Sequence, residues 1–273
     1  MCRLAYFKNI KGTKVYDNLP FLLQYLEEKR GGHGNGVGAL IKKKGKKVFW
    51  IRKGLGYDVY MATNDIKELL PKAVNGVFFH TRLASMGKVT SRLNHPFATK
   101  HLMLIHNGAN AGKDRIMMEM QKMAISFNYS KPYSDSLLLT LLLSKYYEQT
   151  RDEEMTALYA LNIINPVNAV YIQFYGTGNV YLIVKQQDFQ LYYDGKTVVA
   201  ASEGLEVIYD RDIYTCDECI VKITKNDLET IYGELVPTWE EESTPYYEEI
   251  DYDLPLEEYE YYAKLLWREK EYM

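Results

Sequence analysis

The chain has 273 residues, of which 47% are hydrophobic and 25% are charged, and its formal net charge is −3. This is the composition of an ordinary globular protein able to bury one substantial core, and so small a net charge favours no class of partner. No apolar run approaches the ~18 residues of a membrane-spanning helix, and the N-terminus lacks the apolar segment of a signal peptide. We therefore expect a cytoplasmic protein with no membrane partner.

Cys2 precedes the first expected strand, Leu4–Phe7. Cysteine is small enough for Met1 to be removed, which would leave a thiol and a free α-amine on one residue. Because an α-amine titrates near pKa ~7.7–8.0 and a thiol near ~8.5, the amine can take the thiol proton at neutral pH. Cys2 is therefore a candidate nucleophile, although cysteine also occurs at this position by chance.

The next elements are an expected helix, Leu19–Lys29, and two expected strands, Gly38–Ile41 and Val48–Arg52. The basic run Lys42–Lys47 separates the two strands. Such a run can mark a nucleic-acid site, but its place between two strands favours a solvated hairpin tip. We expect no nucleic acid as partner. A short helix is expected next, over Ile66–Leu70.

Polar residues then gather at the ends of several elements. The clusters are His80-Thr81-Arg82 at the end of the strand Val77–Thr81, Asn94-His95-Pro96, His106-Asn107-Gly108 at the end of the strand Met103–His106, and Ser134-Asp135-Ser136 at the start of the helix Ser136–Tyr147. A further helix is expected over Ile116–Ile125. Four polar clusters at element ends suggest one shared site.

The second half is rich in strands, which are expected over residues 168–175, 180–185, 191–193, 198–202 and 220–223. Asp194-Gly195 predicts a hairpin turn. The pattern alone predicts an α+β fold with two sheets and flanking helices. Cys216 and Cys219 have the spacing of zinc and redox sites, but no further ligands accompany them. A reduced structural pair is favoured, an oxidised pair stays open, and neither a metal nor a cofactor is expected.

The last segment differs in composition from the rest, so we predict a domain over residues 2–236 and an acidic, tyrosine-rich extension over 237–273. Such a segment can be partly disordered, and Glu257–Trp267 has helical spacing. Either the extension packs on its own domain, or its aromatic side chains dock a partner or a second copy of the chain.

Five of these motifs together resemble the class II glutamine amidotransferases. That family has an N-terminal Cys, His-Thr-Arg-x-Ala-Thr-x-Gly, Asn-x-His-Pro, His-Asn-Gly and Ser-Asp, and all five patterns occur here in the family's order. The resemblance covers about residues 2–225. Gly34–Gly38 and Ala201-Ser202-Glu203 are most similar to stand-alone members, which lack a fused synthase. The resemblance implies the four-layer αββα sandwich of the N-terminal nucleophile hydrolases.

The resemblance also implies a role for each site residue, and each role has a chemical reason. The Cys2 thiolate would attack a side-chain amide carbonyl, and the Asn107 amide with the Gly108 N–H would stabilise the oxyanion. Arg82 would bind the substrate α-carboxylate and Asp135 its α-ammonium group. The substrate would be glutamine or another small γ-glutamyl molecule, cleaved through a thioester.

Two further residues belong to the expected pocket. Ser85 is expected to contact the substrate, and His95 is expected to order the pocket loop. Four positions depart from the family pattern. Asn35 replaces Asp, Val37 replaces Trp, Leu83 replaces an aromatic residue and Ser85 replaces Thr. These changes concern the identity of the substrate more than the chemistry.

Each motif also has a purely structural interpretation. Arg82 and Asp135 can form an ordinary ion pair, Ser134 with Asp135 can cap a helix, and Asn107-Gly108 can form a turn. Three functions therefore remain open. They are a glutaminase that passes ammonia to a separate synthase subunit, a hydrolase of another γ-glutamyl amide or peptide, and an inactive relative that serves as a binding or structural protein.

Overall fold

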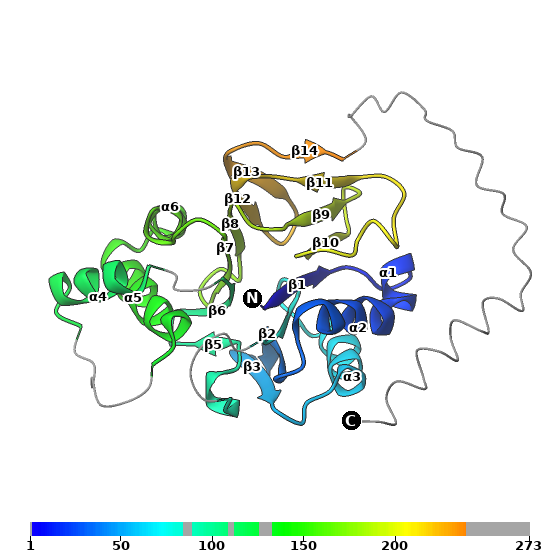
Figure 1. Cartoon of the computed structure of the whole chain (residues 1–273), viewed down its shortest axis with the longest axis horizontal. Coiled ribbons are helices and arrows are strands. Elements are labelled where there is room, and N and C mark those ends of the chain that lie inside the picture. The colour runs from blue at the N-terminus through cyan, green and yellow to red at the C-terminus, as the bar shows by residue number, and fades with distance from the viewer. Residues whose placement is uncertain (1, 84–88, 109–111, 126–132, 239–273) are drawn as a thin grey trace, which may run out of the picture. The chain divides into compact units, whose positions relative to one another are not determined.

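The computed structural model describes residues 2–83, 89–108, 112–125 and 133–238 (Figure 1). Ser85 and the extension from residue 239 onward, with its expected helix, lie outside these residues. The helices are α1 (Lys14–Asp17), α2 (Leu19–Arg30), α3 (Val59–Leu69), α4 (Lys113–Lys122), α5 (Asp135–Thr150), α6 (Glu153–Ile163) and a 3₁₀ turn, Ser91–Leu93. None of the described helices combines the length and apolar character needed to cross a bilayer.

The described strands form two sheets in which every pairing is antiparallel. The eight-stranded sheet has the order β14-β11-β9-β10-β1-β4-β2-β3 and the six-stranded sheet β13-β12-β8-β7-β6-β5. Their bounds are β1 Arg3–Lys8, β2 Asn35–Lys43, β3 Lys46–Gly54, β4 Val77–Thr81, β5 Phe97–Ala98, β6 Leu102–Asn107, β7 Asn168–Phe174, β8 Val180–Lys185, β9 Gln190–Tyr193, β10 Val198–Ala201, β11 Ile213–Thr215, β12 Glu218–Ile223, β13 Leu228–Tyr232 and β14 Val236–Pro237.

Three hydrophobic clusters hold these elements together. One cluster, which includes Phe7, joins the eight-stranded sheet to α1–α3, and another, which includes Leu104, joins the six-stranded sheet to α4–α6. The third lies between the two sheets and contains Leu4 and Ile105. Figure 1 accordingly shows α1–α3 together on one side of the strands and α4–α6 together on another. This mixture of helices with two large antiparallel sheets confirms the predicted α+β class.

Strand alternation decides which side chains enter each cluster. Successive side chains of a strand point to opposite faces of its sheet, so Leu4 and Tyr6 of β1 face the second sheet, whereas Ala5 and Phe7 face the helices. All six residues of β1 are buried, because the strand lies between β4 and β10 and is covered on both faces. β1 therefore provides a rigid support for the residue before it, Cys2.

Most expected elements are present, and the differences have local causes. The helix expected over Ile66–Leu70 is the end of α3, which begins at Val59 after an N-cap by Asp58, whose side chain accepts from Met61 N–H at 2.7 Å. Polar residues in its middle obscure the helical pattern. α1, α6, β5, β11, β13 and β14 were not expected from the sequence.

The lysine-rich run is a hairpin tip, as predicted. β2 and β3 pair through to Lys43 and Lys46, and Lys44 and Gly45 form the turn with φ values of 49° and 77°. Residues 42–46 are exposed. The second expected turn is also present, since Asp194 accepts from the N–H groups of Lys196 at 3.0 Å and Thr197 at 2.6 Å.

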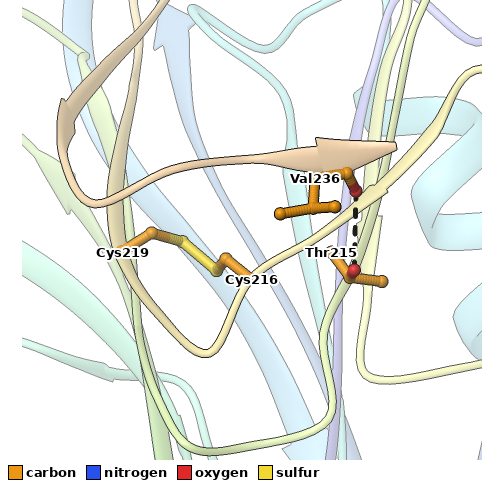
Figure 2. The surroundings of a disulfide bond; sticks show 4 residues. All are labelled: Thr215, Cys216, Cys219 and Val236. Atoms are coloured by element: carbon orange, nitrogen blue, oxygen red, sulfur yellow. Dashed lines mark hydrogen bonds between the residues drawn. A yellow bond between two sulfur atoms is a disulfide. The ribbon is translucent and has the colours of Figure 1, made fainter. Parts of the chain in front are cut away.

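Cys216 and Cys219 form a disulfide (Figure 2), so the favoured prediction of a reduced pair is wrong. The two residues lie in the tight connection from β11, in one sheet, to β12, in the other, and their Cα atoms are 6.2 Å apart, which a disulfide can bridge. A two-residue spacer suits reduced, oxidised and metal-bound pairs alike, so spacing alone could not distinguish them.

Candidate active site

Cys2 and Asn107, two of the predicted site residues, lie where β1 begins and β6 ends. Cys2 directly precedes β1, and the alternation of side chains along this strand places Cys2 on the same face of the sheet as Leu4. The same alternation in β6 places Asn107 on the face of Ile105. Both faces look into the space between the sheets. The two strand ends are neighbours, because His80, the β4 partner of Leu4, contacts the His106 carbonyl oxygen through Nε2 at 3.2 Å.

Cys2 is half-buried as a residue, and its sulfur lies 3.7 Å from the Leu83 carbonyl oxygen. Burial raises the pKa of the thiol, the positive charge of Arg82 lowers it, and the negative charge of Asp135 raises it. Arg82 and Asp135 are therefore both close enough to act electrostatically on Cys2, although the three residues are distant in sequence. The structure thus brings together the predicted nucleophile and both predicted substrate-binding charges.

Arg82 follows β4 and is 7% exposed. Its Nη1 donates to Asn94 Oδ1 at 3.4 Å, and its backbone N–H donates to the Gly34 carbonyl at 2.9 Å. Gly34 must be glycine, because its φ is +127° and a Cβ there would overlap the Asn94 side chain. These contacts join the Gly34–Gly38 motif and the Asn94-His95-Pro96 motif to the arginine.

Lys53 is a site residue that sequence reasoning missed. Its Nζ donates to the carbonyl oxygens of Asn94 at 2.5 Å and Pro96 at 2.8 Å, and burial lowers its pKa to about 8. The ammonium group therefore fixes the loop that carries His95. A lysine in a strand gives no sign of this role, since the two acceptors belong to another segment.

Asp135 is the first residue of α5 and is half-buried. The helix cap is Ser134, whose Oγ accepts from Leu137 N–H at 3.1 Å, while Asp135 Oδ1 accepts from Ser136 N–H at 2.8 Å. The capping interpretation thus applies chiefly to Ser134. Because the carboxylate also acts electrostatically on Cys2, a structural role for Ser134 and a substrate role for Asp135 are compatible.

Asn107 ends β6 and is fully buried. Within the described part of the chain, its Oδ1 has no hydrogen-bond partner, and its Nδ2 lies 3.3 Å from the Gln187 amide oxygen when that amide is oriented to satisfy both its ends. An amide nitrogen carries two donors, so this contact leaves one for a ligand.

The surroundings of Gly108 leave no room for a side chain. A Cβ at Gly108 would overlap Asn168 Oδ1 and lie 2.9 Å from His106 Nε2, and the residue has φ +151°. His106 itself contacts Ser136 Oγ through Nδ1 at 2.9 Å and Asn168 Oδ1 through Nε2 at 2.6 Å. One histidine therefore links the end of β6 to the starts of α5 and β7, and positions Asn107 relative to Asp135.

His95 lies in a buried histidine cluster. Its ring centroid is 4.0 Å from that of His80 and 4.8 Å from that of Phe97. Burial lowers the pKa of His95 well below its usual range and lowers that of His80 to about 3. Both rings are therefore neutral at physiological pH, which favours packing roles over proton transfer.

Neutral buried histidines make stability depend on pH. The unfolded chain binds a proton at His80 below about pH 6.5, whereas the folded chain does not bind it until about pH 3. The stability that comes from keeping His80 neutral is therefore fully present above about pH 6.5 and is lost as the pH falls. Between pH 7 and pH 5 we expect His80 to remove about 2 kcal/mol from the free energy of unfolding. Urea unfolding should show a smaller pH dependence for His80→Gln than for the parent. Equal pH dependence in the two proteins would contradict this account.

The Ala201-Ser202-Glu203 motif anchors the start of β1. Ser202 Oγ accepts from Leu4 N–H at 3.0 Å, and Ser202 N–H donates to the Leu4 carbonyl at 3.0 Å. Glu203 forms an ion pair with Arg3, and Arg3 also lies 3.5 Å from Asp188. Arg3 and Asp188 were missed by sequence reasoning; the only signal was a charged residue next to Cys2.

A cleft of about 540 Å³ lies beside this anchor. Its lining consists of Gln186–Gln190, Ser202, Glu203, Thr215, Cys216 and Asp217. Among the described residues, no group of histidine, cysteine, aspartate and glutamate side chains is arranged to hold a metal ion.

The fold of this chain can be compared with the folds of solved structures. The chain shares its fold with solved structures that include a glutamine phosphoribosylpyrophosphate amidotransferase, which confirms at the level of the fold the resemblance that the motifs indicate. No family model and no curated protein matches the chain.

Two solved structures illustrate the likeness. One is the glutamine phosphoribosylpyrophosphate amidotransferase of B. subtilis complexed with ADP and GMP, with a TM-score of 0.56 and 14% identity. The other is described as the allosteric regulatory enzyme of purine biosynthesis, with a TM-score of 0.58 and 17% identity. Each alignment covers 84% of this chain and 48% of the other, so the chain spans about half the length of these proteins.

Proposed function

We propose that this protein is an amidohydrolase of the glutamine amidotransferase type, with Cys2 as its N-terminal nucleophile. The observation that carries the proposal is the convergence of Cys2, Arg82 and Asp135, from the start of β1, the end of β4 and the start of α5. In this proposal the two sheets and their flanking helices form a four-layer αββα sandwich, with the site at one end of the space between the sheets.

The reaction begins with removal of Met1, which frees the α-amine of Cys2. This amine takes the thiol proton, and the thiolate forms a bond to the γ-carbonyl carbon of the substrate. The negative charge moves to the carbonyl oxygen, where Asn107 Nδ2 and Gly108 N–H stabilise it. The Cys2 ammonium then protonates the leaving nitrogen as its bond to carbon breaks, releasing ammonia and a γ-glutamyl thioester. Water, deprotonated by the same amine, hydrolyses the thioester and restores the thiol.

Substrate selection in this proposal rests on two charges. Arg82 binds the α-carboxylate, and burial with support from Asn94 limits its freedom to move. Asp135 accepts from the α-ammonium group at the start of α5. Ser85 is proposed to contact the substrate as well, and His95 to order the loop beside the pocket. The substrate is L-glutamine, and a separate synthase subunit would receive the ammonia.

Ammonia release from L-glutamine tests this function, and two adjacent residues provide matched variants. Asp135→Asn should raise KM at least about tenfold, because losing a charge-assisted hydrogen bond typically costs about 1.5–3 kcal/mol. Ser134→Ala should instead lower stability by about 1 kcal/mol and leave KM unchanged. Kinetics and urea unfolding of both variants separate the two roles.

The substrate range decides between the functions that the sequence left open. Ammonia release from glutamine supports the proposal. Cleavage only of larger γ-glutamyl amides would identify a different hydrolase, and no turnover of either by a correctly processed chain would indicate a binding or structural protein.

A further inference from the structure

The Cys216–Cys219 disulfide (Figure 2) lies in the connection between the two sheets, and Cys216 lines the 540 Å³ cleft. β11 ends at Thr215 in the eight-stranded sheet, and β12 begins at Glu218 in the six-stranded sheet. Cys219 is fully buried in the cluster between the sheets, whereas Cys216 is half-buried and lines the 540 Å³ cleft. One sulfur is thus accessible from the cleft and the other is enclosed.

Three consecutive residues connect this cross-linked turn to the site. Gln186 N–H donates to the Asp217 carbonyl, inside the disulfide loop, at 2.5 Å. Gln187 contacts the Asn107 amide at 3.3 Å, and Asp188 lies 3.5 Å from Arg3, the residue after Cys2. A change in the turn therefore reaches both the proposed oxyanion donor and the support of the proposed nucleophile through one short loop.

The charge around Cys216 favours a cross-link that a reductant opens, although the Cys-x-x-Cys spacing by itself also suits a thiol–disulfide catalyst. Among the described residues, Asp188, Glu203 and Asp217 line the cleft and no lysine or arginine does. Arg3 pairs with Asp188 and Glu203, so the charge nearest the disulfide loop is that of Asp217, which lies inside the loop.

The cross-link should also act locally. It closes a loop of only a few residues, and short loops give little stabilisation through chain entropy. Thr215 is held independently, because its Oγ1 lies 3.5 Å from the Val236 carbonyl oxygen and β11 pairs with both β9 and β14 (Figure 2). Breaking the disulfide should therefore loosen the turn at Asp217 and leave the sheets intact.

We propose that the Cys216–Cys219 disulfide is a redox switch for the candidate site: the oxidised pair holds Gln187 and Asp188 in the active arrangement, and a dithiol reductant releases them. A thiolate of the reductant attacks Cys216 Sγ, and the bond to Cys219 breaks with the electron pair leaving on Cys219. The second reductant thiol displaces Cys216. The protein gains two protons and two electrons, and the reductant becomes a disulfide. The inference rests on the proposed function of the site.

Hydrogen–deuterium exchange of the full chain tests the coupling without relying on activity. Dithiothreitol should accelerate exchange of the Gln186–Phe189 backbone, and the double variant Cys216→Ser/Cys219→Ser should show the same fast exchange without reductant. Iodoacetamide labelling followed by intact mass measurement reports whether the disulfide is closed. Thr215→Val, which leaves both cysteines in place, is the matched control and should exchange like the oxidised parent.

Ammonia release is measured on the same samples. The double variant should lose about tenfold in kcat/KM, within the ~5–150-fold range of typical site-to-site couplings. Its activity should not respond to reductant, which separates the switch from any effect of reductant on Cys2. Faster exchange with no ammonia release from any sample would support the coupling and contradict the proposed function. Unchanged exchange at Gln186–Phe189 after confirmed reduction would overturn the switch.

Discussion

Replacing Cys2 by alanine is expected to abolish ammonia release from glutamine, with a loss on the order of 10⁴–10⁶-fold in kcat, as for nucleophile removal in serine hydrolases. The reason is chemical, since no other thiol is close to Arg82 and Asp135 in the described part of the chain: the other two cysteines form a disulfide. Alanine is also small enough to permit removal of Met1, so lost processing would not explain the loss. Steady-state kinetics of the purified variants provide the measurement.

Two further variants make the Cys2 result specific. Inserting one alanine between Met1 and Cys2 keeps the thiol but moves the free amine to another residue, so it should cost nearly as much as Cys2→Ala. Lys44→Ala, at the exposed β2–β3 turn, should retain parental activity. A Cys2→Ala enzyme that keeps a tenth or more of parental kcat would show that another group performs the reaction.

Replacing Asn107 by alanine has the second largest expected effect, a loss of about 10²–10³-fold in kcat. The amide is fully buried at the end of β6 and faces the space where Cys2 begins, so its free N–H is preorganised for the charge that develops on the carbonyl oxygen. Because this charge is absent from the ground state, KM should change little. Kinetics on glutamine separate the two parameters.

Stability must be measured for the same variants, since Asn107 is buried. Asn107→Ala should still unfold cooperatively, and Asn226→Ala, at an exposed turn between β12 and β13, should match the parent in kcat. A large rise in KM with unchanged kcat would place Asn107 in substrate binding and not in stabilisation of the oxyanion.

Much of the candidate site could be predicted from the order of short motifs. Cys2, Arg82 and Asp135 lie at element ends, and strand and helix patterns located those ends to within a few residues. Alternation along β1 and β6 then predicts which side chains face a common space. The site residues come together only when the two sheets pack against each other, and no local sequence pattern predicts that packing.

The supporting residues could not be predicted, because their partners come from distant segments. Lys53 binds the carbonyl oxygens of another loop, and His106 joins three elements through its two ring nitrogens. Glu203 belonged to a recognised motif, yet its pairing with Arg3 depends on β10 lying next to β1. The disulfide depends on where two sheets meet, and the absence of further metal ligands in the sequence favoured the wrong state.

The most direct test of the account is the intact mass of the purified protein before and after incubation with 6-diazo-5-oxo-L-norleucine, an electrophilic analogue of glutamine, followed by peptide mapping. The account predicts a chain that lacks Met1 and gains a single adduct on Cys2, with no adduct on Cys2→Ala. A chain that retains Met1, or a processed chain that gains no adduct at Cys2, would contradict it.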